Sequence, residues 1–413
     1  MTNDLGVCRP QPRVSHRNWL FVLGATLIIQ TINAYLYFLT PTLAPAISQM
    51  VGMGSDFVGW LVAIGILGSI GFMLIGTPIV QWLGPMRALQ FGTLLGGCGV
   101  CLMAVGTPLT LLVANVLMGI GYGPSSPAGS EVLQRFTPRE YRNLVFSVRQ
   151  AGVPIAGLTA GLMLPLIQDY GGWSWVIATT LLLVVASTLA VSPLRSKVDR
   201  DGASGHRPSL GNITRLSNLM APFRSLLDDG LLGLSVSGAL LAVGHGCWTA
   251  YLVTWLNTAG DLTLKESGAA FAVMQISSIF GRLAMGALAD RWVSPLITLR
   301  LVAVLSALVS LVAGVAGSLV QLYGYIVFSV AAGLFVSSWN GIQIAEIVRR
   351  SNPERISASA SGATIIMFIG LIVGPILFSA ILRETGDFSA CFLVTSILTA
   401  MAYGFYRRTG PPV

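Results

Sequence analysis

The chain has 413 residues, of which 54% are hydrophobic and only 10% are charged. A soluble globular domain carries about a quarter charged residues, so the composition excludes a soluble protein, and the high hydrophobicity excludes a disordered chain. The length excludes a single membrane anchor. The composition therefore predicts an all-α membrane protein that crosses the bilayer many times.

Twelve apolar segments are long enough to cross a bilayer, which takes about 20 residues in a helix. They lie at roughly 19–39, 57–80, 88–106, 108–128, 144–167, 173–193, 229–255, 268–289, 297–317, 321–345, 359–382 and 389–406. The residues before the first segment are polar and basic, and no small-residue cleavage site follows a short apolar core. We therefore expect the first segment to be a membrane span and not a removed signal peptide.

The net charge of +8 is explained by membrane orientation. With the amino terminus in the cytoplasm, twenty of the 24 Lys and Arg residues fall on the cytoplasmic side, and only Lys265 and Arg383 fall outside. Positive charge concentrates on the cytoplasmic side of membrane proteins. The pattern predicts a multi-pass protein of a bacterial-type inner membrane with both termini cytoplasmic. Its expected partner is the lipid bilayer, and a nucleic-acid partner is unnecessary.

The longest connection divides the spans six from six. We expect an N-terminal half at 1–193, a cytoplasmic central loop at 194–228 and a C-terminal half at 229–413. Apolar residues at helical spacing between Ile213 and Leu227 predict an amphipathic helix on the inner membrane surface, although a plain linker fits the loop equally well.

The two halves repeat one another in sequence. A shift of 210 residues places Gly71, Gly76, Trp82 and Pro85 on Gly281, Gly286, Trp292 and Pro295, and a shift of 213 places Gly157 and Gly161 on Gly370 and Gly374. Repeated six-span halves are typical of transporters that rock about a site between them.

A loop signature carries a family resemblance. Gly286-Ala287-Leu288-Ala289-Asp290-Arg291 resembles the G-x-L-x-D-R loop of the major facilitator superfamily, while the copy after the second span lacks the acid. Asn115, Gly119 and Gly121 in span 4 and the glycine-rich 152–157 in span 5 are similar to the family's patterns, with Asn115 in place of an arginine. Phe280-Gly281-Arg282-Leu283, just before the signature, resembles bacterial organic-anion and monocarboxylate carriers, and the overall pattern also resembles the cyanate-permease type.

The resemblance implies a fold and a mechanism. It implies a monomeric, twelve-helix secondary transporter that works by alternating access, with spans 1, 4, 7 and 10 around the cavity. It also implies that the signature residues Gly286, Asp290 and Arg291 act as a gate. We expect Asp290 to cap a helix or to form a salt bridge with the other half.

Two arginines lie inside predicted spans, whereas no Asp or Glu lies deep in one. An arginine at the centre of a span costs roughly 2.5–3.5 kcal/mol on insertion scales, and such residues are functional by default. The planar fork of arginine suits carboxylates, so Arg149 and Arg282 predict an anion site. Arg149 could instead reach the inner surface, or pair with Asp290 or Glu131.

Polar residues on the spans expected to line the cavity complete the candidate site. His245 could exchange a proton near neutral pH or form an ordinary hydrogen bond between helices. Substrate contacts are also expected from Asn33, Tyr37, Asn115, Tyr122, Trp248, Trp339 and Asn340.

We find no Walker motif, metal-ligand spacing or nucleophile elbow, so no cofactor, metal or catalytic residue is expected. The sequence therefore predicts proton-coupled uptake of a small organic anion and no enzyme activity. A drug or metabolite exporter of the same fold is one alternative, and a membrane receptor or membrane enzyme is another.

Overall fold

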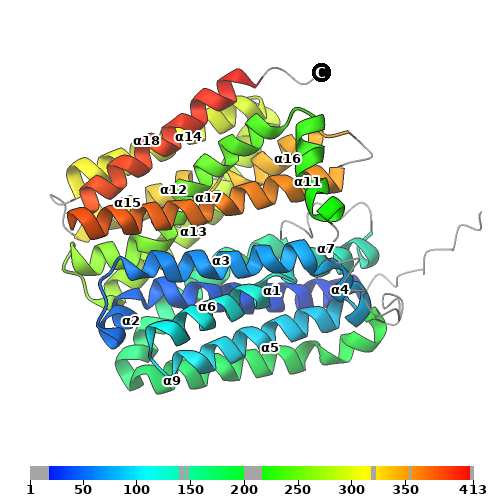
Figure 1. Cartoon of the computed structure of the whole chain (residues 1–413), viewed down its shortest axis with the longest axis horizontal. Coiled ribbons are helices and arrows are strands. Elements are labelled where there is room, and N and C mark those ends of the chain that lie inside the picture. The colour runs from blue at the N-terminus through cyan, green and yellow to red at the C-terminus, as the bar shows by residue number, and fades with distance from the viewer. Residues whose placement is uncertain are drawn as a thin grey trace, which may run out of the picture.

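The computed structural model describes residues 18–138, 145, 148–199, 216–317, 322–352 and 356–409. The described chain is almost entirely helical and forms two groups of helices (Figure 1). Arg139, Arg142 and the basic tail before residue 18 lie outside the described residues. The predicted all-α membrane architecture is confirmed.

The first group lies below the second in Figure 1. Its helices are α1 (Asn18–Thr42), α2 (Ala44–Val51), α3 (Phe57–Ile75), α4 (Thr77–Leu83), α5 (Pro85–Met103), α6 (Pro108–Tyr122), α7 (Ser125–Phe136) and α9 (Gly152–Asp199).

The second group begins after the short α11 (Leu216–Asp228). It contains α12 (Leu232–Thr258), α13 (Leu264–Arg291), α14 (Pro295–Ala316), α15 (Leu322–Ala331), the π-helix η3 (Ala332–Val336), α16 (Asn340–Arg350), α17 (Ile356–Thr385) and α18 (Phe388–Arg408).

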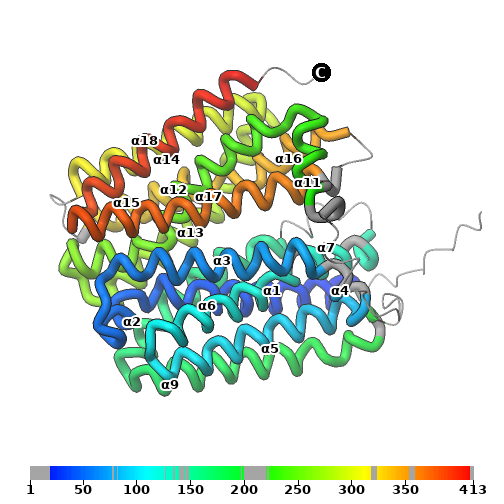
Figure 2. The backbone as a smooth tube through the Cα atoms, viewed as in Figure 1, coloured from blue at the N-terminus to red at the C-terminus, as the bar shows by residue number. Residues whose placement is uncertain are grey.

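Eleven helical stretches of the described chain are long and apolar enough to cross a membrane. One of them, Val148–Ser196, includes most of α9, whose 48 residues are interrupted at Gly172 by a left-handed φ of 66° and a ψ of −161°. This backbone conformation is open to glycine because it has no Cβ. Figure 2 shows the α9 tube turning back at the left-hand end of the molecule. Counted as two crossings, α9 agrees with the twelve predicted spans.

Two spans run further than hydropathy predicts. The fourth continues through α6 and α7 to Leu133, and the tenth continues through α15, η3 and α16 to Arg350. Charged residues such as Glu131 and Glu346 lower the hydropathy at these ends. The helical hydrogen bonds continue past them because a charged residue does not interrupt the backbone ladder.

Glycines allow the helices of the first group to touch backbone to backbone. A Cβ on Gly119 would meet the carbonyl of Gly65, and a Cβ on Gly68 would lie 2.6 Å from the carbonyl of Val116. Small residues at helix crossings are the usual means of close packing in membranes. The repeated glycines differ in use, because Gly161 contacts α13 in the other group whereas Gly374 contacts α12 within its own.

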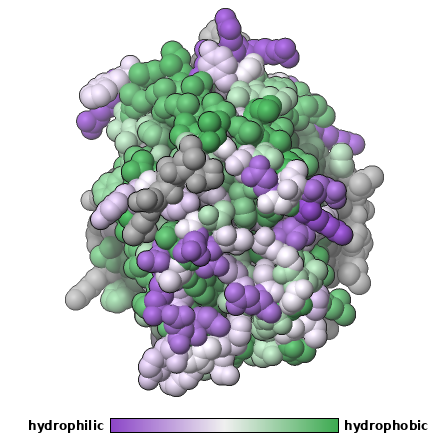
Figure 3. All heavy atoms as spheres, turned by 90° about the vertical axis from the view of Figure 1, so that its left-hand side faces the viewer, coloured by the Kyte–Doolittle hydropathy of each residue, from purple (hydrophilic) through white to green (hydrophobic). Residues whose placement is uncertain are grey.

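The molecule has two ends that differ in what they carry. We call the end with α11 and the C-terminus the linker end, and the opposite end, with α2, the far end (Figure 1). Because α1 leads into α2 at the far end, α1 begins at the linker end. Seen from the far end, hydrophilic side chains gather over the middle and lower part of the face, with hydrophobic surface above (Figure 3).

The central connection contains a helix, as one of the two sequence interpretations predicted. α11 packs on α17, and the hydroxyls of Ser225 and Ser359 lie 2.6 Å apart. Leu226 is fully buried at this contact. The described part of the connection is therefore attached to the second group.

Candidate functional site

A cavity of about 620 Å³ lies between the two groups of helices. Pro154 of α9 lines it from the first group, and Arg282 of α13 and Asn340 of α16 line it from the second. It extends to Asp290 and Arg349, whose side chains are exposed at the linker end. Two of the predicted site residues, Arg282 and Asn340, are thus brought to one cavity.

Arg282 faces this cavity with most of its hydrogen-bonding capacity unused. Its Nε donates to the carbonyl of Ser337 at 3.2 Å. We find no acceptor among the described residues for its two terminal nitrogens. Ser337 directly follows the π-helix η3, a type of irregularity found often at functional sites. The fork of Arg282 is therefore available to an anion in the cavity.

Arg149 is held inside the first group and is only 3% exposed. One terminal nitrogen donates to Oε1 of Gln30 at 3.0 Å and also to the carbonyl of Ser125. The other lies 3.4 Å from the hydroxyl of Ser130, while its Nε has no partner among the described residues. The next residue, Gln150, lines the cavity.

The alternative ion pairs of Arg149 are not formed in this structure. Glu131 pairs with Arg135 one turn away on α7, and Asp290 forms no ion pair with another described residue. A Cβ on Gly129 would lie 2.6 Å from the central carbon of the Arg149 guanidinium. Glycine at this position of α7 therefore makes the space for the arginine, a requirement that the sequence alone did not reveal.

Tyr122 shares a hydrogen-bonding partner with Arg149, the side chain of Gln30. Gln30 places it, because Nε2 of Gln30 donates to the Tyr122 hydroxyl at 3.2 Å while Oε1 of Gln30 accepts from Arg149. Gln30 thus joins Tyr122 of α6 to Arg149 within the first half, whereas Arg282 of the second half lines the cavity.

His245 and Trp339 form an aromatic pair in the second group. Their ring centroids are 6.4 Å apart with the planes at 88°. Trp339 is 2% exposed, and its indole N–H has no partner among the described residues.

Three of the predicted substrate contacts form hydrogen bonds within their own half. Asn115 accepts from Thr40 at 2.8 Å and donates to the carbonyl of Leu111 at 2.9 Å. Asn33 donates to the hydroxyl of Ser125 at 3.0 Å. Trp248 is fully buried, with its N–H 3.0 Å from Ser310. Eight of the predicted substrate-binding residues are not among those that line the cavity: Arg149, His245, Trp248, Asn33, Tyr37, Asn115, Tyr122 and Trp339.

The signature residues lie at the linker end of α13. Gly286 and Asp290 line the cavity, and Arg291 is exposed beside them. In the first half, where the signature lacks its acid, Asp199 at the end of α9 is buried against the start of α5. It accepts from the backbone amides of Met86 at 2.9 Å and Arg87 at 3.2 Å at the start of α5.

Glu346 is a cavity residue that the sequence interpretation missed. It lies in α16, is 1% exposed, and forms ion pairs of 2.6 Å with Arg349 and with Arg350. The expected boundary of the tenth span fell one residue before it, so it was counted as a loop acid. Its buried position corrects that assignment, and its charge is matched by two arginines.

The far end of the molecule is closed by contacts between the halves. The Tyr251 hydroxyl donates to the carbonyl of Asp56 at 3.1 Å and accepts from the amide of Gly59 at 3.0 Å. Ser379 donates to the same Asp56 carbonyl at 2.6 Å. Phe38 and Phe271 meet edge to face at 5.6 Å.

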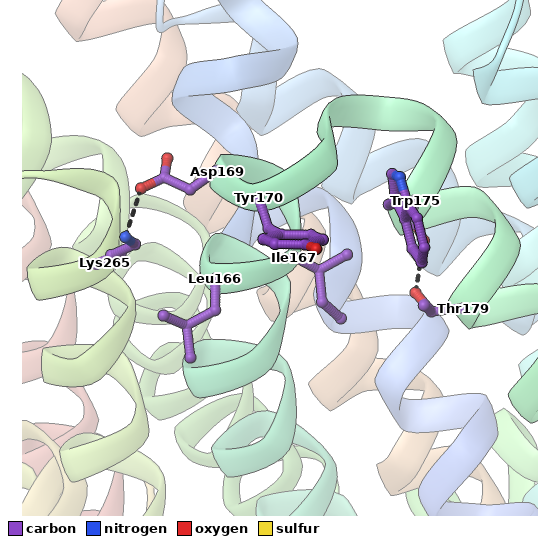
Figure 4. A pocket seen from close by; sticks show the side chains of 7 residues that line it. All are labelled: Leu166, Ile167, Asp169, Tyr170, Trp175, Thr179 and Lys265. Atoms are coloured by element: carbon purple, nitrogen blue, oxygen red, sulfur yellow. Dashed lines mark hydrogen bonds and ion pairs between the residues drawn. The ribbon is translucent and has the colours of Figure 1, made fainter.

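An ion pair lies at the edge of this closure (Figure 4). Asp169 of α9 and Lys265 of α13 are 2.8 Å apart, and each side chain is about half exposed, at 51% and 48%. Exposed pairs of this kind contribute about 0–1 kcal/mol. Tyr170 and Trp175 form a surface pocket next to the pair. The far end is thus held mainly by its buried contacts.

Within the described part of the chain, no three His, Cys, Asp or Glu side chains gather as metal ligands. The cavity presents the positive charge of Arg282 and reaches the linker end of the molecule, while the far end is closed.

Known proteins share this sequence pattern and this fold. An uncharacterized MFS-type transporter of Mycobacterium tuberculosis is 22% identical over 82% of this chain and 74% of its own. Human monocarboxylate transporter 11 is 26% identical over 92% of this chain and 80% of its own. The crystal structure of a bacterial homologue of the human lysosomal transporter Spinster, in an inward-facing and unoccupied conformation, has a TM-score of 0.74. It is 16% identical and covers 95% of this chain and 97% of that one.

The family itself follows from a match over most of the chain. The sequence model of the Major Facilitator Superfamily matches residues 26–364. The resemblance noted in the loop signature is thereby confirmed, and the family and fold are those of transporters and not of enzymes. The chain is a multi-pass membrane protein that belongs to the major facilitator superfamily of secondary transporters.

Proposed function

We propose that this transporter moves a small organic anion, a carboxylate, through the cavity between its halves. The observation that carries the proposal is Arg282, whose guanidinium faces the cavity with two nitrogens that have no acceptor among the described residues. A carboxylate accepts two parallel hydrogen bonds from such a fork. Human monocarboxylate transporter 11, similar over most of its length, is named for the same chemical class.

The charge balance of the cavity supports an anion. Of the acids that line it, Glu346 is already paired with two arginines, and Asp290 is exposed at the linker end. The deeper part of the cavity therefore presents Arg282 with no facing carboxylate. A cationic drug would meet an uncompensated positive charge there, which disfavours the alternative of a cation exporter.

A thermal-shift screen of the purified protein tests the substrate class. A ligand that binds only the folded state raises Tm, so we expect small carboxylates to raise it in a concentration-dependent way. Inorganic anions serve as the control for charge alone, and cationic amines serve as the control for the exporter. If amines stabilise the protein and carboxylates do not, the anion proposal is wrong.

The orientation and assembly complete the proposal. The linker end faces the cytoplasm of a bacterial-type inner membrane, with both termini there, because the basic loops concentrate at that end. The chain acts as a monomer made of an N-terminal half at 1–193, a loop at 194–228 and a C-terminal half at 229–413. In this orientation the cavity is open to the cytoplasm and closed to the outside.

Proton coupling predicts a pH dependence of uptake. A symporter that takes a proton with each anion transports faster as the outside pH falls, because proton binding from that side is favoured. The proton can travel on His245, on the substrate or on a water held by an arginine, and His245→Gln removes the dependence of uptake on outside pH only if the histidine is the carrier. Uptake into proteoliposomes at several outside pH values, with and without an uncoupler, measures both effects.

Two results of that experiment would contradict proton-coupled uptake or the role of His245 in it. A His245→Gln variant with unchanged pH dependence leaves the histidine a structural role only. Accumulation that an uncoupler does not reduce replaces proton symport with exchange or facilitated flow.

The loop signature acts as the inner gate in this proposal. Asp290 has no ionic partner among the described residues while the cavity is open, and it engages the first half when this end closes. Asp290→Asn is therefore expected to slow transport without reducing the amount of folded protein. Transport rate and yield measured together check this, and a normal rate at normal yield removes the gating role.

A further inference from the structure

We infer that the break in the tenth span is the second part of the anion site, where backbone N–H groups at the start of α16 bind the carboxylate that Arg282 holds. This inference rests on the proposed anion function and adds the groups that bind the anion beside the arginine. The break is residues 337–339, which lie between the π-helix η3 and α16 and belong to neither helix.

Five consecutive backbone N–H groups at the break lack acceptors. The amide of Ser337 completes the π-helix, and the first amide of α16 with a helical acceptor is that of Gln343, which donates to the carbonyl of Trp339 at 3.0 Å. The amides of residues 338–342 have no acceptor among the described residues. Four of them are the donors that every helix leaves free at its N-terminus, and the fifth belongs to the break itself.

The break is buried, which makes the missing acceptors costly. Ser338 is 1% exposed and Trp339 is 2% exposed. The indole N–H of Trp339 and the hydroxyl of Ser337 also lack a partner among the described residues. Orphaned N–H groups away from water are rare in proteins, and non-helical backbone at membrane depth lies within protein or lines a cavity. The break therefore gathers unsatisfied donors that a ligand with acceptor oxygens would satisfy.

The break opens on the same cavity as Arg282. Three residues of the break and of the first turn of α16 line it: Ser338, Asn340 and Gly341. The Nε atom of Arg282 donates to the carbonyl of Ser337 at 3.2 Å, so the guanidinium is held against the break with its two terminal nitrogens unused. There is space beside the first turn of α16, because nothing lies within 4 Å of a Cβ at Gly341.

A carboxylate matches this set of donors. Its two oxygens offer about four acceptor positions, so the fork of Arg282 takes two of them and amides of α16 take the others. The N-terminus of a helix also carries roughly half a positive charge, which favours an anion there. Half-helix N-termini at breaks in membrane spans bind anionic substrate groups in other transporter folds. The second half of the molecule thus supplies charged and backbone donors to one carboxylate.

A proline in the first turn of α16 tests the inference, because it removes one backbone N–H. Gly341→Pro is compatible with the helix, since the N–H at this position has no helical acceptor. The probe is whichever of acetate, propionate and benzoate binds the unmodified full-length protein most tightly. We expect its affinity, measured by calorimetry, to fall roughly 10- to 150-fold in Gly341→Pro, the loss for one hydrogen bond to a charged group.

Gly341→Ala is the matched control. It keeps the N–H and adds a methyl group where nothing lies within 4 Å, so its affinity is expected to stay within about twofold of the original. Should Gly341→Pro fail to fold, Asn340→Pro and its control Asn340→Ala repeat the comparison at the first residue of α16, where proline is favoured. The Tm of each variant without the probe shows that a lost affinity is not a lost fold.

The outcomes separate this inference from the proposed function. If the proline variants fold and bind the probe as tightly as their alanine controls, the backbone site is wrong, and the anion function stands as long as Arg282→Ala abolishes binding. If Gly341→Ala loses as much affinity as Gly341→Pro, added volume explains the loss and the inference is also wrong. If none of the three carboxylates binds the unmodified protein, the anion function itself is wrong.

Discussion

Gly59→Val is expected to hold the two halves apart at the far end and to stop transport. Gly59 lies near the start of α3, where its amide donates to Tyr251 of α12. A Cβ at this position would lie 2.5 Å from the Tyr251 hydroxyl and 2.9 Å from Cβ of Ser379, and would also meet the carbonyl of Pro375. Two of these neighbours belong to α17, so valine obstructs the approach of that helix.

The expected size of the effect follows from packing. Forcing extra methyl groups into a close contact costs typically about 1–3 kcal/mol. Only the state closed at the far end contains this contact, so the whole penalty falls on that state. A difference of this size shifts an equilibrium between two states by roughly 5- to 150-fold, enough to depopulate the closed state.

Spin labels on opposite halves measure the shift. Met53 and Glu384 are exposed at the far end, on the first and second half respectively, and cysteines placed there in a background without the native cysteines carry the labels. We expect Gly59→Val to lengthen the label-to-label distance and to abolish transport in proteoliposomes. Gly71→Val is the matched control on the same helix, because nothing lies within 4 Å of a Cβ at Gly71.

The control decides how the result is read. If Gly71→Val also stops transport, the loss comes from valine in α3 and not from the contact between halves. If Gly59→Val transports normally with an unchanged distance, the contact at Tyr251 does not need glycine and the assignment of the far-end closure is wrong.

The sequence revealed the parts of this fold that depend on local composition. Apolar length located the spans, and charge located Arg149 and Arg282, because an arginine in an apolar segment stands out in any hydropathy reading. Arg149 proved to share Gln30 with Tyr122, and Arg282 proved to line the cavity between the halves. The fold could therefore be predicted almost completely from hydropathy, charge and the repeat.

The contacts between distant segments could not be predicted in this way. Gly59 and Tyr251 are 192 residues apart, and the sequence around neither residue indicates contact with the other. Helical spacing also failed to separate cavity residues from packing residues. Asn115 and Trp248 lie on the expected spans, yet Asn115 bonds to Thr40 and Trp248 bonds to Ser310.

Glu346 shows a second limit of sequence reading. A span predicted from hydropathy ends where charged residues begin, whereas the helix itself continues through Arg349 and Arg350. These two arginines pair with Glu346 and neutralise its charge. Burial of a carboxylate depends on its partners, and partners one turn away on the same helix look like surface residues in a sequence.

Arg282→Lys is expected to weaken binding of the transported carboxylate although the positive charge is kept. Lysine cannot present two parallel N–H donors to a carboxylate. Hydrogen bonds to charged groups contribute about 1.5–3 kcal/mol each, so losing one lowers affinity by roughly 10- to 150-fold. Calorimetry on the folded variant measures it, with Arg383→Lys as the control, because Arg383 is exposed in the last turn of α17.

Arg149→Ala is expected to lower the stability of the protein more than its affinity for the carboxylate, which is the reverse of the expectation for Arg282→Lys. Arg149 donates to Gln30 and to the carbonyl of Ser125 inside the first half. Removing it leaves buried acceptors without a donor, each costing about 1–3 kcal/mol. The variant should therefore lose several degrees of Tm, while carboxylate affinity falls less than in Arg282→Ala.

The comparison of the two alanine variants tests the two-arginine site as a whole. In our proposal Arg149 acts on the anion through Tyr122 and Gln30 and through its own positive charge, so its removal weakens binding without abolishing it. Arg282 holds the anion directly, so its removal abolishes binding. Carboxylate affinity equal to the wild type in both folded variants would exclude an anion site at these arginines, because neither charge would then contribute to the bound state.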